Sequence, residues 1–231
     1  MSAAGVKLEV VGDPALRCAQ RMTEIAGAGG QIVLTGGSTP RRAYELAAQQ
    51  RDAWSGATLW FGDERCVPPD DERSNYRMAR EALLDALAEH PPTVNRMRGE
   101  LGPEAGADAY EAVLRDAGGP AFELLLLGLG PDGHIASLFP DQDTLSERSR
   151  LVVGVEQAGH EPFVPRISLS LSAIASAKQV MLLITGAEKA DAVAAAFGTD
   201  AVPNPHIPAS LLPSLADDVI VLLDEAAAVK L

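Results

Sequence analysis

The stretch FELLLLGLGPDGH, residues 122–134, decides the fold class of this 231-residue chain. It joins a continuous apolar run to a loop that contains Gly128, Gly130 and Gly133. An apolar run without polar alternation is typical of a strand that a parallel sheet buries on both faces. Similar runs recur along the chain, and most are followed by an alanine-rich stretch of helical character. This alternation predicts an α/β protein.

The expected elements cover most of the chain. The strands are Leu8–Val11, Ile32–Thr35, Thr58–Phe61, Phe122–Leu127, Leu151–Val155, Arg166–Leu169, Val180–Ile184 and Val219–Leu223. The helices are Pro14–Ala28, Pro40–Gln50, Asn75–Ala88, Glu104–Ala117, Glu188–Phe197 and Glu225–Lys230. Their order predicts a doubly wound, mostly parallel sheet with helices on both faces, which is Rossmann-like. No stretch has the composition of an interdomain linker, so we expect one domain over residues 1–231.

Composition limits the function classes. Hydrophobic residues make up 47% of the chain, enough for a large core, which excludes overall disorder. With 19 basic and 32 acidic residues, the net charge of −13 argues against binding to nucleic acid or to an anionic membrane surface. An anionic substrate would therefore need a local positive site.

The termini, apolar runs and cysteines suggest the compartment. Residues 1–11 lack the pattern of a signal peptide, and the longest apolar run is too short to cross a bilayer. Two cysteines, Cys18 and Cys66, form no disulfide framework in a chain of this length. We expect a cytoplasmic protein without membrane association.

A glycine turn follows the strand that ends at Thr35. It consists of Gly36, Gly37, Ser38, Thr39 and Pro40, and a helix follows. Paired glycines let a ligand approach the backbone, and proline suits the first helical position. Free N–H groups and the positive end of the helix dipole would then face one point, which suits a phosphate. The alternative interpretation is a strand-to-helix turn without a ligand, because such turns often contain the same residues.

Three charged residues, Asp63, Glu64 and Arg65, follow the next strand, where a ligand crevice is expected. The Arg65 guanidinium suits a bidentate contact to a phosphate or carboxylate. The two carboxylates would either accept hydrogen bonds from sugar hydroxyls or hold the arginine. A solvated loop with an internal salt bridge is the alternative interpretation.

The loop at residues 128–133 matches the pattern G-x-G-x-x-G of dinucleotide-binding folds. We reject that function because Pro140 cuts short the helix that the pattern requires, and the polar stretch 141–150 shows no apolar period. His134 remains at the carboxyl end of a strand, where it can act as a general base near neutral pH. Asp132 is close enough in sequence to orient it. A histidine that only stabilises the turn is the alternative.

Two further cations, Arg166 and Lys189, could add positive charge beside the glycine turn, although ordinary surface positions would explain both. His206 is interpreted as structural. No set of His, Cys, Asp or Glu residues has the spacing of a zinc or EF-hand site, so we expect no metal.

Together these segments resemble the 6-phosphogluconolactonase family. The matching segments are TGGSTP (35–40), GDERCVP (62–68), SNY (74–76), GLGPDGH (128–134), ASLFP (136–140), RISL (166–169) and GAEK (186–189), in the order of the family. One departure is Ile135, where the family usually carries threonine. Glucosamine-6-phosphate deaminases share the fold and an Asp-Gly-His loop that continues into Asn-Glu-Pro with a catalytic glutamate. This chain has Ser-Leu-Phe-Pro at residues 137–140 instead, so the resemblance favours lactone hydrolysis.

The resemblance implies hydrolysis of 6-phospho-D-glucono-1,5-lactone to 6-phosphogluconate in the oxidative branch of the pentose phosphate pathway. The sugar phosphate would lie on the turn formed by Gly36, Gly37, Ser38 and Thr39, surrounded by Arg65, Arg166 and Lys189. His134, with Asp132 beside it, would activate a water for attack on the lactone carbonyl. No cofactor is implied.

Two alternative functions stay open at this point. A deaminase or isomerase would act on glucosamine 6-phosphate, and a deaminase would release ammonia from it. A non-catalytic sugar-phosphate sensor would usually carry a DNA-binding segment. We expect no room for such a segment, because the first strand begins near residue 8, and the acidic net charge is also adverse.

Overall fold

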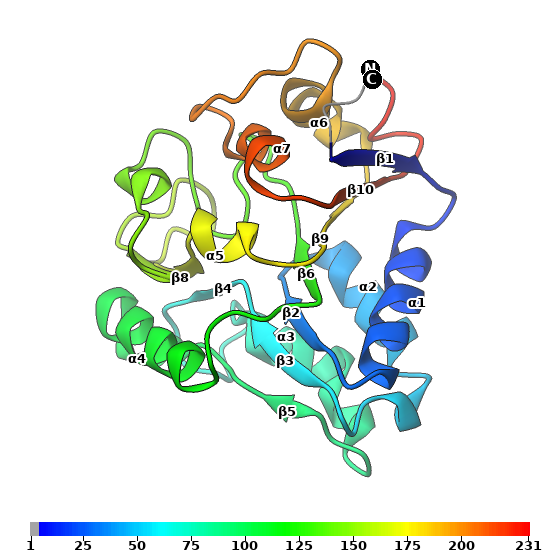
Figure 1. Cartoon of the computed structure of the whole chain (residues 1–231), viewed down its shortest axis with the longest axis vertical. Coiled ribbons are helices and arrows are strands. Elements are labelled where there is room, and N and C mark those ends of the chain that lie inside the picture. Colours follow the sequence, from blue (N-terminus) through cyan, green and yellow to red (C-terminus); the bar gives the residue numbers. More distant parts are fainter. Residues whose placement is uncertain (1–4) are drawn as a thin grey trace.

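The main sheet has seven strands, all paired in parallel, in a computed structural model that describes residues 5–231 (Figure 1). In spatial order the strands are β1 (Val6–Val10), β10 (Val219–Leu223), β9 (Val180–Ile184), β6 (Leu124–Leu127), β2 (Gln31–Leu34), β3 (Thr58–Phe61) and β5 (Thr93–Val94). This confirms the predicted α/β class with a mostly parallel sheet.

Helices cover the sheet from both sides. They are α1 (Pro14–Gly27), α2 (Ser38–Ala47), α3 (Asn75–Ala82), α4 (Pro103–Asp116), α5 (Leu171–Ala175), α6 (Ala190–Phe197) and α7 (Leu212–Leu215). Helices α1 and α2 lie to one side of the central strands and α4 and α5 to the other (Figure 1). Within residues 5–231, no helix combines the length and the apolarity needed to cross a membrane.

A second, smaller sheet is antiparallel. It consists of β4 (Asp63–Arg65), β8 (Arg166–Leu169) and β7 (Val152–Val155), in that order. The sequence predicted β7 and β8 but not their separate sheet, and it did not predict β4. Strand β4 consists of three charged residues and so lacks the apolar pattern of a strand. Pairing with β8 places Asp63 opposite Ser168 and Arg65 opposite Arg166.

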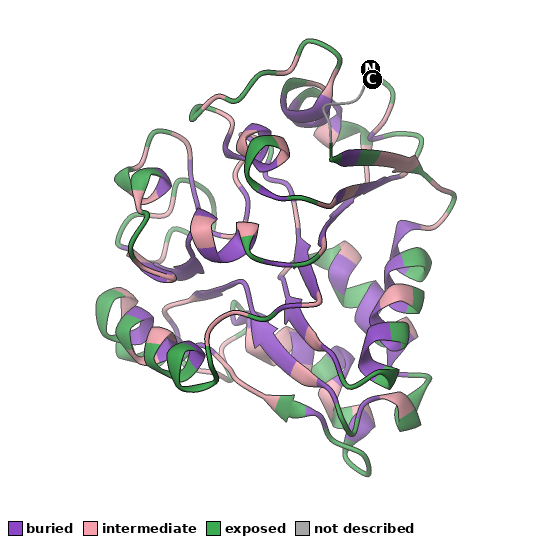
Figure 2. Cartoon of the chain, viewed as in Figure 1, coloured by how far each residue is buried: buried purple, intermediate pink, exposed green. Residues whose placement is uncertain are grey.

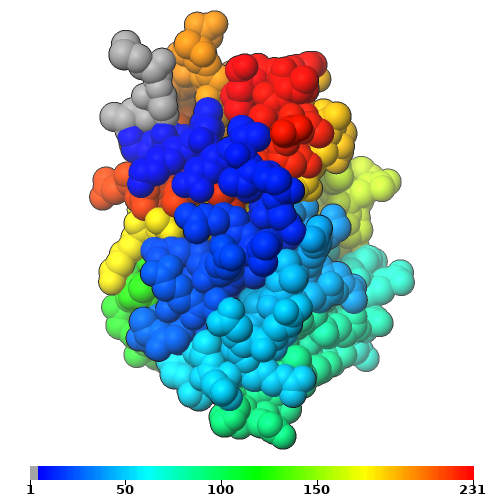
Figure 3. Space-filling view, turned by 90° about the vertical axis from the view of Figure 1, so that its right-hand side faces the viewer, coloured from blue at the N-terminus to red at the C-terminus, as the bar shows by residue number. Residues whose placement is uncertain are grey.

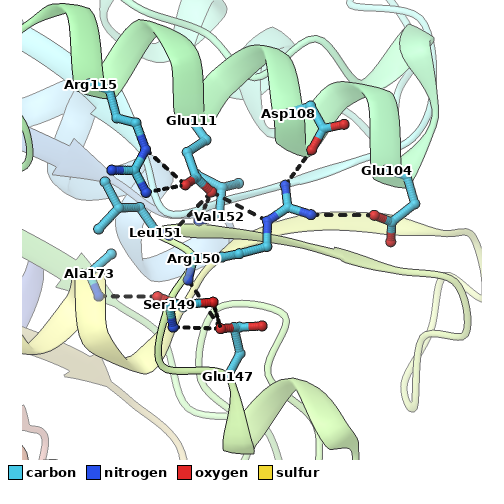
Figure 4. Close-up of polar contacts among 11 residues, drawn as sticks. Glu104, Asp108, Glu111, Arg115, Glu147, Ser149, Arg150, Leu151, Val152 and Ala173 are labelled. Atoms are coloured by element: carbon cyan, nitrogen blue, oxygen red, sulfur yellow. Dashed lines mark hydrogen bonds and ion pairs between the residues drawn. The ribbon is translucent and has the colours of Figure 1, made fainter.

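A cluster of charged side chains fixes α4 to this small sheet (Figure 4). Arg150 contacts Asp108 at 2.5 Å and Glu104 at 3.6 Å, both on α4. Glu111, also on α4, accepts hydrogen bonds from the backbone amides of Leu151 and Val152 at 3.2 and 3.3 Å. Helix α4 therefore supports the sheet that carries Asp63, Arg65 and Arg166.

The core lies around the main sheet (Figure 2). All four residues of β6 and all five of β9 are buried, as expected for strands covered on both faces. Two buried tyrosines fix the ends of neighbouring strands. The Tyr44 hydroxyl accepts a hydrogen bond from the Thr35 amide and donates to the Thr35 carbonyl, each at 2.8 Å. Tyr110 makes the same kind of contact with the Phe61 amide, at 2.8 Å.

The two ends of the described chain lie side by side, because β1 pairs with β10 (Figure 3). The predicted helix Glu225–Lys230 is wrong, since residues 225–230 form consecutive turns instead. The Asp224 carboxylate accepts a hydrogen bond from the Ala227 amide at 2.8 Å and thus competes with helical bonding. A six-residue segment also gains too few hydrogen bonds to offset the cost of helix nucleation.

The remaining differences concern element ends and short elements. All eight predicted strands are present, with shifts of one or two residues at some ends. The predicted helix 75–88 ends at Ala82 and continues as a 3-10 helix at Leu84–Leu87. The two-residue strand β5 and the short helices α5 and α7 were not predicted, because segments of two to five residues show no periodicity.

Replacing Tyr110 with phenylalanine tests the role of its hydroxyl. We expect Tyr110→Phe to lower the free energy of unfolding by about 1–3 kcal/mol, because the buried Phe61 amide loses its acceptor. Urea denaturation measures this change. Tyr76→Phe, at a half-buried tyrosine, is the control and should stay within about 0.5 kcal/mol of the wild type. Equal stability of Tyr110→Phe and the wild type would contradict this role.

Candidate active site

A pocket of about 330 Å³ lies at the carboxyl ends of β2, β6 and β9. The strand order reverses between β2 and β6, since the chain continues from β2 toward β3 and β5 on one side and from β6 toward β9 and β10 on the other. Such a reversal separates neighbouring loops and leaves a crevice in which doubly wound proteins bind ligands. Loops after all three strands line the pocket, and the small sheet contributes to its wall.

The turn after β2 presents the N-terminus of α2 to this pocket. Gly37 is the N-cap residue with φ of 115°, a left-handed conformation that favours glycine, and no side chain caps the helix. Gly36, Gly37, Ser38 and Thr39 all line the pocket. The amides of the first turn have no intrahelical acceptors and carry the positive end of the helix dipole. This end of the pocket therefore favours an anion.

Three cations, Arg65, Arg166 and Lys189, line the same pocket. None of them forms an ion pair with a carboxylate within residues 5–231. The Arg65 guanidinium donates one hydrogen bond, from Nη1 to the Arg73 carbonyl at 2.5 Å, and its buried Nε has no partner among the described residues. Lys189 donates to the Leu129 carbonyl at 2.8 Å. In a chain of net charge −13, three cations without carboxylate partners in one pocket indicate an anionic ligand.

Arg166 is the most buried of these cations, with 3% of its surface exposed. Its Nε donates to the Val164 carbonyl at 3.1 Å, and its Nη2 donates to the Pro162 and His160 carbonyls at 2.7 and 3.3 Å. Burial lowers the pKa of the guanidinium, which nevertheless stays charged at neutral pH. Arg166 thus fixes the loop between β7 and β8 and adds positive charge to the pocket wall.

The loop after β6 holds His134 against Asp132. The imidazole Nδ1 lies 2.6 Å from Oδ1 of Asp132, which also accepts the His134 amide at 3.2 Å. An ionised carboxylate only accepts hydrogen bonds, so Nδ1 carries the proton and Nε2 of the neutral ring is a free base. Burial acts to raise the pKa of Asp132, but the hydrogen bonds that it accepts from His134 and its electrostatic interaction with that residue lower it below its ordinary value.

Gly130 makes room for this pair. A Cβ at this position would lie 2.0 Å from Nδ1 of His134 and 2.6 Å from Oδ1 of Asp132. The glycine therefore permits close packing of both side chains against the backbone, a role different from that in a dinucleotide fingerprint. The Phe139 ring packs on the His134 ring with centroids 4.8 Å apart. His134 lines the pocket, whereas Asp132 lies outside the lining that the described residues form.

Asp63 and Glu64 have different environments. Asp63 lines the pocket and accepts hydrogen bonds from Asn75 Nδ2 at 3.0 Å and from Ser137 Oγ at 2.7 Å. Glu64 is buried and accepts hydrogen bonds from the side chain of Ser74 and from backbone amides at the start of α3. Burial raises the pKa of Glu64, and these hydrogen bonds oppose the rise. Glu64 therefore holds α3, and it neither forms an ion pair with Arg65 nor lines the pocket.

The sequence missed one histidine of the pocket. His160 lines the pocket, and its ring lies 5.6 Å from that of His134. No local pattern marks it, because the turn of the chain between β7 and β8 brings it there. His206 lies elsewhere and pairs with Asp141 at 2.5 Å. No group of three or more His, Cys, Asp or Glu side chains within residues 5–231 is arranged to hold a metal ion.

Comparison with known proteins places the chain in a family. The model for glucosamine-6-phosphate isomerases/6-phosphogluconolactonase matches residues 9–221. A 6-phosphogluconolactonase of Mycobacterium leprae (strain TN) is 44% identical over 213 residues, which cover 87% of this chain and 84% of the relative. That of Synechocystis sp. (strain ATCC 27184 / PCC 6803 / Kazusa) is 37% identical over 205 residues, covering 86% of this chain and 83% of the relative.

Solved structures agree with this assignment. The 6-phosphogluconolactonase from Trypanosoma cruzi has a TM-score of 0.85 and 31% identity and covers 100% of this chain and 98% of its own. A monomeric glucosamine-6-phosphate deaminase has a TM-score of 0.82 at 20% identity, with 98% of this chain and 100% of that chain covered, and shares the fold. The chain therefore belongs to the glucosamine-6-phosphate isomerase/6-phosphogluconolactonase family.

Proposed function

We propose that this chain hydrolyses 6-phospho-D-glucono-1,5-lactone to 6-phosphogluconate, the lactonase step of the oxidative pentose phosphate pathway. Relatives that are 37–44% identical are named 6-phosphogluconolactonase, which supports this activity. The observation that best supports the proposal is the set of groups that line one pocket. A free imidazole nitrogen, oriented by a carboxylate, shares that pocket with three cations and an uncapped helix N-terminus.

The phosphate of the substrate would bind at the N-terminus of α2. There it accepts hydrogen bonds from the amides of Ser38 and Thr39 and from the cations Arg65, Arg166 and Lys189. The dianion is remote from the reacting carbon. Its binding energy orients the sugar so that the lactone carbonyl lies next to His134.

The imidazole would then act first as a base and later as an acid. Nε2 of His134 takes a proton from a water whose oxygen bonds to C1, and the carbonyl electrons move to the carbonyl oxygen. When the tetrahedral intermediate collapses, the bond between C1 and the ring oxygen breaks. The imidazolium returns its proton to that oxygen, and the new carboxylic acid releases a proton to water. The Asp132 carboxylate stabilises the imidazolium between these steps.

A single general base and a phosphate-binding site are sufficient for this reaction. A δ-lactone is an activated ester. General-base catalysis of roughly 10²–10⁴-fold, together with positioning of the substrate, therefore accelerates its hydrolysis well above the spontaneous rate. The alternative deaminase function lacks support in the loop after His134. Ser137 is hydrogen bonded to Asp63, and Leu138 and Phe139 are buried, so residues 137–139 present no acidic group to the pocket.

Replacing His134 tests the base. We expect His134→Ala to lower kcat by roughly 10²–10⁴-fold, because the reaction loses its general base. The affinity for 6-phosphogluconate should change little, since the phosphate contacts remain. Acid release from lactone generated in situ measures the rate after spontaneous hydrolysis is subtracted. His90→Ala is the matched control, because His90 is exposed and contacts Asp52 at 3.4 Å outside the pocket. An unchanged kcat in His134→Ala would remove His134 from the mechanism.

Replacing Asp132 tests the orientation of the ring. We expect Asp132→Asn to lower kcat by about 10²-fold or more. The amide NH2 can donate to Nδ1 and so favour the tautomer protonated on Nε2, and the neutral side chain does not stabilise the imidazolium. The pKa of Asp132 is lower in the folded protein than in the unfolded chain. Its contact with His134 therefore stabilises the folded state fully above the ordinary aspartate pKa of about 3.9, and this stabilisation disappears as the pH falls through the lowered pKa. The free energy of unfolding should therefore fall less steeply with decreasing pH in Asp132→Asn than in the wild type. The control is Asp52→Asn, and a full kcat in Asp132→Asn would contradict the proposed orientation.

Inorganic phosphate tests the anion site. At a hundredfold excess over its Kd, binding should add about 2.7 kcal/mol to stability and raise Tm by roughly 5–10 °C. Arg65→Gln should reduce this rise, because a cation and its buried Nε–H are lost from the pocket. Thermal unfolding with and without phosphate measures the effect. Arg51→Gln, at an exposed position outside the pocket, should keep the full rise. The same rise in Arg65→Gln and the wild type would place Arg65 outside the phosphate site.

A further inference from the structure

His160 lies on the rim of the pocket with a fixed backbone. It belongs to the loop between β7 and β8 and is exposed in the absence of substrate. The buried Arg166 donates hydrogen bonds to the carbonyls of His160, Pro162 and Val164. These contacts use backbone oxygens only. A substitution of the imidazole therefore leaves the anchoring of the loop intact.

A hydrogen bond of the His160 ring determines its tautomer. Nδ1 lies 3.0 Å from the carbonyl oxygen of Glu161, which only accepts hydrogen bonds. The proton of the neutral ring is therefore on Nδ1, and Nε2 is an acceptor. His134 has the same tautomer, because its Nδ1 donates to Asp132. The pocket thus contains two imidazoles, with ring centroids 5.6 Å apart, that each offer an unprotonated Nε2.

The hydrogen-bond donors of the substrate determine which of its groups can bind to Nε2 of His160. The dianionic phosphate and the lactone carbonyl only accept hydrogen bonds, so the sugar hydroxyls are the only groups of the substrate that can donate to Nε2. The phosphate lies toward α2 in the proposed orientation, and C1 lies at His134. The hydroxyl on C2, the carbon next to the lactone carbonyl, is therefore the nearest donor to the second imidazole.

We propose that His160 is a specificity residue that accepts a hydrogen bond from the hydroxyl on the carbon next to the lactone carbonyl. The proposal rests on the lactonase function proposed above, and it identifies His160 as the hydrogen-bond partner of the C2 hydroxyl. A lactone without this hydroxyl lacks the hydrogen bond to Nε2, which lowers its kcat/KM. His160 contacts the substrate and transfers no proton.

A cycle of residue and substrate deletions tests the contact. kcat/KM is measured for the wild type, His160→Ala and His160→Gln with the phosphogluconolactone and with its 2-deoxy analogue. We expect the wild type to prefer the hydroxylated lactone by roughly three- to tenfold. His160→Ala should lose most of this preference by slowing on the hydroxylated lactone alone. His160→Gln should retain part of it, because its amide oxygen also accepts. His90→Ala should match the wild type on both lactones.

Three outcomes would overturn the proposal. In the first, His160→Ala slows equally on both lactones or on neither, which shows that no contact to this hydroxyl exists. In the second, His160→Ala keeps the preference but weakens competitive inhibition by inorganic phosphate, which places the ring at the phosphate end. Both leave the lactonase function standing, because the wild type still hydrolyses the substrate. In the third, the wild type fails to hydrolyse either lactone, and this outcome overturns the proposed function together with the role of His160.

Discussion

The reversal of strand order between β2 and β6 is the constraint on which the pocket depends. It directs the loops after β2 and β6 apart at one edge of the sheet and leaves a crevice between them. The loop after β2 begins a helix and brings positive charge, whereas the loop after β6 brings the His134–Asp132 pair. The topology thus separates an anion-binding end from a proton-transfer end within one pocket.

The small antiparallel sheet completes the anion-binding end. Strands β4 and β8 carry Arg65 and Arg166, and α4 holds this sheet through Glu111 and Arg150. The cations work against the field of a chain with a net charge of −13. Local geometry therefore decides where an anion binds, because exposed charges more than about 10 Å away are largely screened by physiological salt.

Sequence patterns predicted the main sheet and most of the pocket because the responsible signals are local. Continuous apolar runs marked the buried strands, and glycines after them marked the turns at Gly37 and Gly130. His160 escaped prediction because long-range packing places it. Glu64 was misjudged because its partners, Ser74 and the amides of α3, lie about ten residues away. A single domain over residues 1–231, a cytoplasmic location and the absence of nucleic-acid binding stay predictions.

A crystal structure with bound 6-phosphogluconate would show both ends of the pocket at once and so tests the division into an anion-binding end and a proton-transfer end. We expect this structure to show the phosphate within hydrogen-bond distance of the Ser38 and Thr39 amides and the new carboxylate next to Nε2 of His134. A product bound in the reverse direction, or with its carboxylate beyond contact with His134, would rule out this arrangement of the pocket.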